Sequence, residues 1–359
     1  MRILQVIPSL QLAGAETMCE NLSYELVAQG HSVMVVSLYH INSAITERMM
    51  KNGVNLVFLN KKRGFDFSCI KKLKRIVCSF KPDIIHTHLY ALKYGVFAGH
   101  GIPIIHTLHS VASKENTRFQ RWVNRSFYKK GIVLPVALNE ENKKSFDLVY
   151  KIDGLNIPIV PNGVDLGRCL KKDDYGIHGT VRLLHIGRFA NEKNHMELLR
   201  SVKELLTEGF DVHLDLIGDG ALRSNIESFV CDNNMNGSVS LLGPQENVFG
   251  FLHDADIFVL PSLYEGLPMT IIEAMGTGLP IVASRVGGIP NIVIDHENGL
   301  LCDTTSSSIT SAIKAFINNE ELRRKCGVSA KEKAEAFSSK RMCNRYTLLY
   351  EEMLKNAGF

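Results

Sequence analysis

Two glutamates stand eight residues apart in the segment 264–275, YEGLPMTIIEAM. Glu265 precedes a predicted helix that begins near Pro268, and Glu273 lies two turns inside that helix. Carboxylates only accept hydrogen bonds, so each of these two could hold a pair of hydroxyl groups. Both could instead be solvated charges, but the residues on either side of Glu273 are apolar. The segment therefore predicts a binding site for a ligand with vicinal hydroxyls.

Two cations follow an apolar strand in the segment 184–194, LHIGRFANEKN. The strand ends at Gly187, Arg188 comes next, and Lys193 lies in a short loop before a helix. Arginine grips phosphate through a bidentate fork, and lysine acts as a point charge. Either residue alone would be interpreted as a surface cation. Two of them at the carboxyl end of one strand suit a diphosphate.

Four histidines lie close in sequence at His86, His88, His106 and His109. They have no clear carboxylate or cysteine partner that would complete a zinc site. A hydrogen-bonding role at the ends of strands is the favoured interpretation.

Two further motifs favour structural roles. Asp254 and Asp256 form a DxD, a pair of carboxylates that can bind a metal ion, but here Asp256 is expected to mark a helix-to-strand turn. The segment 218–220 (GDG) follows a strand but lacks the third glycine of a dinucleotide fingerprint. No G-x-S-x-G motif supports a serine hydrolase.

Strands and helices alternate along the chain, and the strands are continuous apolar runs. Such strands indicate a parallel, doubly wound sheet that is covered on both faces. Helices are predicted over 14–28 and over a C-terminal segment near 340–354. Strands are predicted at 2–7, 32–37, 55–59, 84–86, 104–107 and 132–137, then at 182–186, 213–217, 239–242, 257–260 and 280–283.

Composition fits a globular protein of two domains. The 359 residues are 45% hydrophobic and 22% charged, and no apolar run is long enough to span a bilayer. The N-terminus does not have the pattern of a signal peptide, and the eight cysteines form no CxxC pair. We therefore expect a cytoplasmic protein with free thiols.

The basic excess lies in the first half. Residues 1–165 contain 21 Lys and Arg against 12 Asp and Glu, a net charge of +9, while the remainder has a net charge of −5. This asymmetry predicts an anionic partner, and no nucleic-acid motif accompanies it. The segment 118–130 has helical spacing and predicts a helix that docks on anionic lipid. The residues assigned to docking are Arg118, Arg121, Trp122, Arg125 and Lys129.

Together these motifs resemble family 4 of the retaining glycosyltransferases, the glycosyltransferases group 1, which have the GT-B fold. The E-x7-E element matches as Glu265 and Glu273, and the GR…K element matches as Arg188 and Lys193. The resemblance covers nearly the whole chain. Further matches are 13–16 (AGAE), 83–88 (DIIHTH), 106–110 (HTLHS), 161–165 (PNGVD), 217–220 (IGDG) and 241–243 (LLG).

The resemblance implies a catalytic set. Arg188 and Lys193 would hold the donor diphosphate and stabilise its charge as the glycosidic bond breaks. Glu265 would sit at the donor sugar, and His109 would reach that sugar near the anomeric centre.

It also implies a donor-binding set. Glu273 would bind the ribose diol, and the backbone of the loop before it would face the phosphates. Gly14 would let the first loop approach phosphate or acceptor, with Ala13 where the family usually has another glycine. The remaining positions are Gly187, Leu241, Leu242, Gly243, Gly266, Leu267, Pro268, Met269, Thr270 and Ile271.

The fold implied is two Rossmann-like α/β domains that face each other across a cleft. Residues 1–165 would form the acceptor-binding domain and residues 166–340 the donor-binding domain, with a hinge at 157–165. The C-terminal helix, assigned to 341–359, is expected to pack back on the first domain.

The predicted activity is that of a retaining hexosyltransferase that uses no cofactor and no metal. It would move a hexose-type sugar from a nucleotide-diphosphate sugar to a glycan or lipid-linked acceptor, in cell-surface polysaccharide synthesis. The enzyme is expected to be cytoplasmic and bound peripherally to the inner face of the cell membrane. Two alternatives remain, a sugar-nucleotide 2-epimerase of the same fold and a non-catalytic nucleotide-sugar-binding subunit. The E-x7-E spacing with EGLP favours the transferase over the epimerase. The intact cations, Glu265 and His109 argue against a non-catalytic subunit.

Overall fold

The computed structural model describes residues 1–11, 13–110, 112 and 117–356. Within these residues the chain forms two compact units. The first comprises Met1–Val164 and the segment from Ser339 onward, and the second comprises Asp165–Ser338. Each unit is described by itself below.

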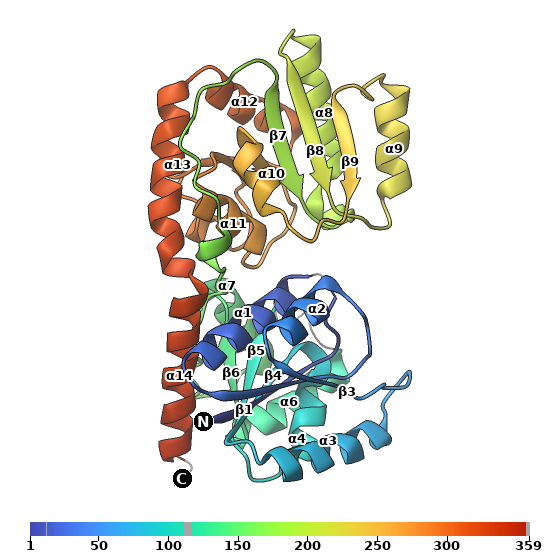
Figure 1. Ribbon diagram of the computed structural model, residues 1–359, viewed down its shortest axis with the longest axis vertical. Coiled ribbons are helices and arrows are strands. Elements are labelled where there is room, and N and C mark those ends of the chain that lie inside the picture. The colour runs from blue at the N-terminus through green and yellow to red at the C-terminus, as the bar shows by residue number, and fades with distance from the viewer. Residues whose placement is uncertain (12, 111, 113–116, 357–359) are drawn as a thin grey trace. The chain divides into compact units, whose positions relative to one another are not determined.

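The first unit, drawn in blue to green with the red helix α14 in Figure 1, contains a six-stranded parallel sheet. The strand order is β3-β2-β1-β4-β5-β6. This is the doubly wound arrangement. The first strand lies in the middle of the sheet, β2 and β3 are added on one side of it, and β4 to β6 are added on the other side. The strands are β1 (Arg2–Ile7), β2 (Ser32–Ser37), β3 (Asn55–Phe58), β4 (Ile84–His88), β5 (Ile104–Leu108) and β6 (Val133–Ala137).

Helices cover both faces of this sheet. Buried residues of α1 (Gly14–Ala28), α2 (Ala44–Lys51) and α14 (Ser339–Asn356) share one apolar cluster with the strands. Those of α3 (Phe67–Phe80), α4 (Leu92–Ala98), α6 (Arg118–Lys129) and α7 (Glu140–Tyr150) share another. Two buried faces explain why the strands are apolar without alternation.

The C-terminal helix α14 belongs to the first unit, although 174 residues of the second unit precede it. Tyr346 and Tyr350 are fully buried against the sheet, and Ser339 Oγ donates to Glu25 on α1 at 2.6 Å. Residues 357–359 of the predicted helix lie outside the described part of the chain.

The second unit repeats the same topology, with the order β12-β11-β10-β7-β8-β9. Its strands are β7 (Val181–Ile186), β8 (Val212–Ile217), β9 (Val239–Gly243), β10 (Ile257–Leu260), β11 (Ile281–Ser284) and β12 (Leu300–Cys302). Its helices are α8 (His195–Thr207), α9 (Arg223–Asp232), α10 (Phe249–Asp254), α11 (Met269–Thr277), α12 (Ser306–Ile317) and α13 (Glu320–Ala334). The doubly wound α/β class predicted from the sequence is confirmed in both units.

In every described helix, length or hydropathy falls short of what a membrane span requires.

Candidate functional site

The loop that carries Arg188 is held by the neighbouring loop after β8. Gly187 N donates to Ile217 O at 2.9 Å, and Phe189 N donates to Asp219 O at 2.9 Å. Gly218 and Gly220 have φ values of +142° and +157°, and a Cβ on them would lie 2.0 Å from Gly187 O and 2.5 Å from Phe189 O. Only glycine permits this approach, so the GDG motif fixes the loop that carries the cations.

Each of the two predicted phosphate-binding cations lies against a carboxylate. Arg188 donates to Glu192 at 2.6 Å, and its side chain is 73% exposed. Lys193 donates to Glu265 Oε1 at 2.6 Å, and both of these side chains are mostly buried. The structure therefore brings Lys193 and Glu265 together from loops that lie 72 residues apart in sequence.

Glu265 is anchored by two serines that the sequence analysis missed. Ser262 Oγ donates to Glu265 Oε1 at 2.6 Å, and Ser284 Oγ donates to Ser262 O at 2.5 Å. Ser262 and Ser284 follow or end the adjacent strands β10 and β11, and both are fully buried. Their signal was present in the sequence as hydroxyl groups at two neighbouring strand ends.

Helix α11 begins directly after the Glu265 loop. Its N-cap is Pro268, which provides no side-chain cap for the N–H groups of the first turn. Uncapped N–H groups and the helix dipole make such a terminus suitable for an anion. The predicted positions Gly266 to Ile271 thus form the loop end and first turn of this helix.

Glu273 lies on the second turn of α11 and is partly buried. Burial raises the pKa of its carboxyl to about 7, and the charge of Arg168 opposes this rise. Arg168 comes from the short helix Leu166–Arg168 and stacks over the ring of Phe249 at 4.6 Å. It was missed because 105 residues separate it from Glu273.

The remaining predicted donor positions of the second unit lie at one strand end. Leu241, Leu242 and Gly243 end β9, and Gly243 O accepts a hydrogen bond from Gly218 N at 3.0 Å. Their backbone therefore connects to the same loop that supports Arg188.

Two buried histidines close to Lys193, His185 and His195, are held neutral by burial, which lowers the pKa of each. His185 lies at the end of β7, and its Nδ1–H donates to Val259 O at 2.8 Å. His195 begins α8, and its ring packs edge-on against His185 with centroids 4.7 Å apart. Burial and then Lys193 lower the pKa of His195 to about 4. Neither histidine therefore carries a positive charge that would compete with Lys193 for Glu265.

In the first unit, the four histidines form hydrogen bonds at the ends of β4 and β5. His86 bonds to Tyr350 at 2.7 Å and to Thr107 at 2.8 Å, while His88 contacts His109 at 3.1 Å. Leu89 follows β4 with φ +51°, a left-handed conformation that costs a branched residue energy. His109 directly follows β5 and is partly exposed.

Gly14 is the exposed first residue of α1, which has no side-chain N-cap. Glu16, in the same turn, is 6% exposed. Burial raises its pKa to about 7, while a hydrogen bond with its own backbone lowers it. The sequence analysis matched the segment 13–16 (AGAE) to the family but assigned no role to Glu16.

The DxD motif has a structural role in the second unit. Asp256 Oδ2 accepts from Arg182 N at 2.9 Å and so ties β7 to the start of β10. Asp254 pairs with His253 at 3.1 Å. Among the described residues, no group of three or more His, Cys, Asp or Glu is arranged to hold a metal ion.

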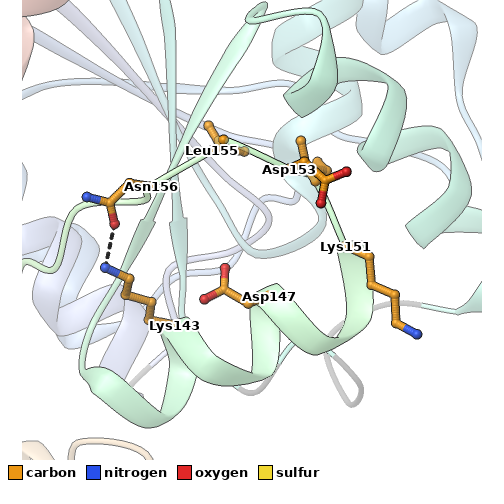
Figure 2. Close-up of a pocket in the computed structure, with 8 residues that line it drawn as sticks. Lys143, Asp147, Lys151, Asp153, Leu155 and Asn156 are labelled. Atoms are coloured by element: carbon orange, nitrogen blue, oxygen red, sulfur yellow. Dashed lines mark hydrogen bonds between the residues drawn. The ribbon is translucent and has the colours of Figure 1, made fainter.

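A pocket of about 390 Å³ lies away from these residues, beside the end of α7 (Figure 2). The loop 151–156 that lines it precedes a segment in which Ile159 pairs parallel with Ala137 of β6. The pocket is therefore at the amino end of the sheet, where parallel α/β folds do not place their active sites. Lys143 donates to Asn156 at 2.6 Å across it.

Comparisons with known proteins identify the family. Residues 171–333 match the glycosyl transferases group 1, and residues 12–168 match glycosyltransferase family 4. The chain is 30% identical over 325 residues to an uncharacterized glycosyltransferase of Methanocaldococcus jannaschii, covering 86% of this chain and 87% of that protein. The chain belongs to the group 1 glycosyltransferases. The family and the enzyme class predicted from the motifs are thus confirmed.

Further similarities fit this group 1 glycosyltransferase. It is 26% identical to an N-acetyl-alpha-D-glucosaminyl L-malate synthase of Bacillus anthracis, over 96% of this chain and 95% of that one. It is 28% identical to a UDP-Gal:alpha-D-GlcNAc-diphosphoundecaprenol alpha-1,3-galactosyltransferase of Escherichia coli, over 70% and 71%. The Anabaena HepE structure in complex with UDP-glucose has the same fold, with a TM-score of 0.83 at 18% identity over 99% and 100% of the two chains.

Proposed function

We propose that this glycosyltransferase is a retaining, metal-independent hexosyltransferase. It moves a hexose from a nucleotide-diphosphate sugar to a glycan or lipid-linked acceptor in cell-surface polysaccharide synthesis. The second unit binds the donor and the first unit binds the acceptor. A relative that is named for its use of UDP-galactose, and a solved neighbour in complex with UDP-glucose, support the donor class.

The observation that carries this proposal is the contact between Lys193 and Glu265 at 2.6 Å. It joins a cation suited to phosphate with a carboxylate suited to sugar hydroxyls. A bound donor would separate them, because its diphosphate would take Lys193 and its sugar would take Glu265. Arg188, on the same loop as Lys193, would exchange Glu192 for phosphate in the same way.

Catalysis would consist of stabilising the leaving group. Arg188, Lys193 and the N-terminus of α11 place positive charge where the diphosphate becomes more negative as the glycosidic bond breaks. The sugar keeps its anomeric configuration because the acceptor oxygen attacks from the face that the phosphate leaves. The departing phosphate oxygen takes the acceptor proton, so no protein nucleophile is required. Glu273 accepts hydrogen bonds from the ribose diol.

Metal independence follows from these fixed cations in the proposal. Transfer should persist in EDTA at wild-type rate, since Arg188 and Lys193 supply the charge that Mg²⁺ supplies in other transferases. Loss of activity in EDTA that Mn²⁺ or Mg²⁺ restores would contradict the proposal and return attention to Asp254 and Asp256.

Relatives and the surface of α6 support the proposed acceptor class. The E. coli relative acts on a diphosphoundecaprenol-linked sugar, and the B. anthracis relative makes a glucosaminyl malate. The exposed surface of α6 favours the lipid-linked class. Phe119 and Trp122 are 73% and 71% exposed, and Arg118 and Lys129 are exposed on the same helix. Aromatic rings beside cations suit the surface of an anionic membrane, and the enzyme would work peripherally on its cytoplasmic side.

The deciding experiment measures release of nucleoside diphosphate from a panel of nucleotide sugars with and without acceptor. A transferase releases it in step with glycosylated acceptor. An epimerase would convert the donor without any acceptor, and a binding subunit would be stabilised by the donor but would not turn it over. Either of these outcomes would replace the proposal.

A further inference from the structure

A chain of hydrogen bonds lies behind His109 in the first unit. His109 Nε2 is 3.1 Å from His88 Nδ1, and His88 Nε2 is 3.0 Å from Gln5 Oε1. Gln5 Nε2 donates to Ser23 Oγ at 2.7 Å. Gln5, Ser23 and His88 are fully buried, and they come from β1, α1 and β4.

The direction of this chain is set at its buried end. Ser23 Oγ lies 2.7 Å from Cys19 O, and because a carbonyl can only accept, the hydroxyl hydrogen of Ser23 points there. Ser23 must therefore accept from Gln5, which fixes the amide nitrogen of Gln5 toward Ser23 and its oxygen toward His88. Cys19 Sγ also donates to this oxygen, at 3.2 Å. His88 Nε2 must then carry a hydrogen.

Both histidines carry a single ring hydrogen. Burial, followed by the neighbouring His86, His109 and His106, holds the pKa of His88 well below its ordinary value. Burial and then His106 lower the pKa of His109 to about 3. With its one hydrogen on Nε2, His88 offers a lone pair at Nδ1. His109 must donate to it from Nε2, which leaves a lone pair on His109 Nδ1.

We propose that Gln5, Ser23 and His88 are positioning residues that hold His109 as its Nε2–H tautomer, with Nδ1 as an acceptor for a sugar hydroxyl. The sugar ligand rests on the proposed function, but the tautomer does not. A neutral acceptor repels the lone pairs of a phosphate oxygen and attracts an O–H group. His109 therefore suits a sugar hydroxyl and not a phosphate oxygen.

The tautomer can be measured without substrate. Long-range proton–nitrogen NMR of protein labelled with nitrogen-15 histidine reports which ring nitrogen carries hydrogen, and His109→Gln identifies the His109 signals among the 13 histidines. We expect His109 and His88 each as a single neutral Nε2–H tautomer from about pH 6 to about pH 8. An Nδ1–H tautomer or an imidazolium at His109 would overturn the proposal.

Variants at Gln5 separate positioning from packing. Gln5→Met keeps the length of the side chain but removes the acceptor, so His109 should become a mixture of tautomers. The value of kcat/KM should then fall about twofold, in proportion to the fraction of His109 that keeps the Nε2–H tautomer. Gln5→Glu restores an acceptor toward His88 and should restore the single tautomer. Gln29→Met makes the same change at an exposed site of the first unit and should change neither reading.

The outcomes are distinguishable from failure of the proposed function. A wild-type protein with the expected tautomer but no glycosyl transfer would reject the function and keep the hydrogen-bond chain. Transfer at wild-type rate by a folded Gln5→Met variant, with His109 still a single Nε2–H tautomer, would reject the chain and keep the function.

Discussion

The strand ends of the two units carry different kinds of polar groups, although the six strands follow the same order in both sheets. β4 and β5 of the first unit lead to His88 and His109, whose pKa values are lowered so that both are neutral. Their counterpart β10 leads to Glu265, which pairs with Lys193 from the loop after β7. One sheet thus presents neutral groups suited to hydroxyls, and the other presents charges suited to a diphosphate.

Net charge gives the opposite impression. The first half has a net charge of +9 and the remainder −5. In the structure, cations of the first unit lie on the exposed sides of α3 and α6, as with Lys71, Lys74 and Arg118. Net charge therefore indicates which surface is suited to an anionic partner, whereas the proposed chemistry depends on the few groups at the strand ends.

The comparison predicts that the charged strand ends dominate the rate. Arg188→Ala or Lys193→Met should lower kcat about tenfold to a thousandfold, because each removes a charged contact to the leaving group. His109→Phe should lower it only about tenfold, because it removes one neutral hydrogen bond. Steady-state kinetics on the cognate donor would measure all three.

Two controls accompany this series. Lys203→Met makes the same change at an exposed lysine of the second unit and should leave kcat unaltered. Lys193→Met also leaves the carboxylate of Glu265 without its cation, so the pair Lys193→Met/Glu265→Gln separates lost stability from lost catalysis. A near-wild-type kcat in Arg188→Ala, or a larger loss in His109→Phe than in Lys193→Met, would reverse the comparison.

The two glutamates of the second unit should separate by ligand. Glu273→Ala should weaken binding of the bare nucleoside diphosphate about tenfold or more, because the ribose loses its acceptor. Glu265→Gln should leave this affinity intact or raise it slightly, since Lys193 is no longer held by a carboxylate. Glu265→Gln should nevertheless damage sugar transfer. Calorimetry with the diphosphate decides, and equal losses in both variants would contradict the assignment.

The surface of the first unit should bind anionic liposomes. Arg118→Glu/Lys129→Glu should weaken co-sedimentation about tenfold or more, since each cation near an anionic surface contributes about 1 kcal/mol. Phe119→Ser/Trp122→Ser should weaken it as well, and raised salt should do the same to the wild-type protein. Leu348 is 65% exposed on α14, and Leu348→Ser provides the control.

Arg125 is left out of that variant because the structure gives it another task. Its guanidinium donates to Tyr150 O at 2.6 Å and to Lys151 O at 3.0 Å, and so holds α6 against the end of α7. Arg121 is likewise partly buried. Of the predicted stripe of four cations, only Arg118 and Lys129 are therefore exposed and available for the proposed docking. Unchanged liposome binding in both double variants, Arg118→Glu/Lys129→Glu and Phe119→Ser/Trp122→Ser, would show that α6 does not bind the membrane.

Sequence patterns predicted most of the strands, because buried parallel strands are continuous apolar runs. They missed β12 (Leu300–Cys302), which is only three residues long, and ended β4 at His86, two residues early, because Thr87 and His88 are polar. The family resemblance of the motifs brought Glu265 and Lys193 into one predicted site. It could not predict their direct contact, since the two loops meet only through the sheet.

Partners that are distant in sequence escaped prediction for the same reason. Gln5 and His88 are 83 residues apart, and they contact each other because β1 and β4 are adjacent and in register, with Gln5 opposite His86. From the sequence, Gly218 and Gly220 were interpreted as an incomplete dinucleotide-binding motif that lacks the third glycine. Their true role depends on how closely a second loop approaches, which a sequence does not record.

The smallest expected effect concerns two carboxyls with raised pKa values, Glu16 in the first unit and Glu273 in the second, both at about 7. An unfolded glutamate has a pKa near 4.3, so between about pH 4.3 and pH 7 the folded protein binds more protons than the unfolded chain. The free energy of unfolding therefore decreases as pH rises through this window, because each buried carboxyl loses its proton.

Replacing either residue with glutamine removes its contribution to the pH dependence of folding stability. At pH 8, Glu273→Gln and Glu16→Gln should each raise the melting temperature of the unliganded protein by a few degrees, which corresponds to about 1 kcal/mol. The gain stays below the full effect of the pKa shift, because Glu273 is partly exposed and Glu16 interacts favourably with the N-terminus of α1. Near pH 4.5 neither variant should differ from the wild-type protein.

Calorimetric scans at both pH values test this, with Glu227→Gln on the exposed side of α9 as the control. A gain at pH 8 that persists at pH 4.5 would mean that glutamine merely packs better, and the burial of these carboxyls would not be what destabilises them.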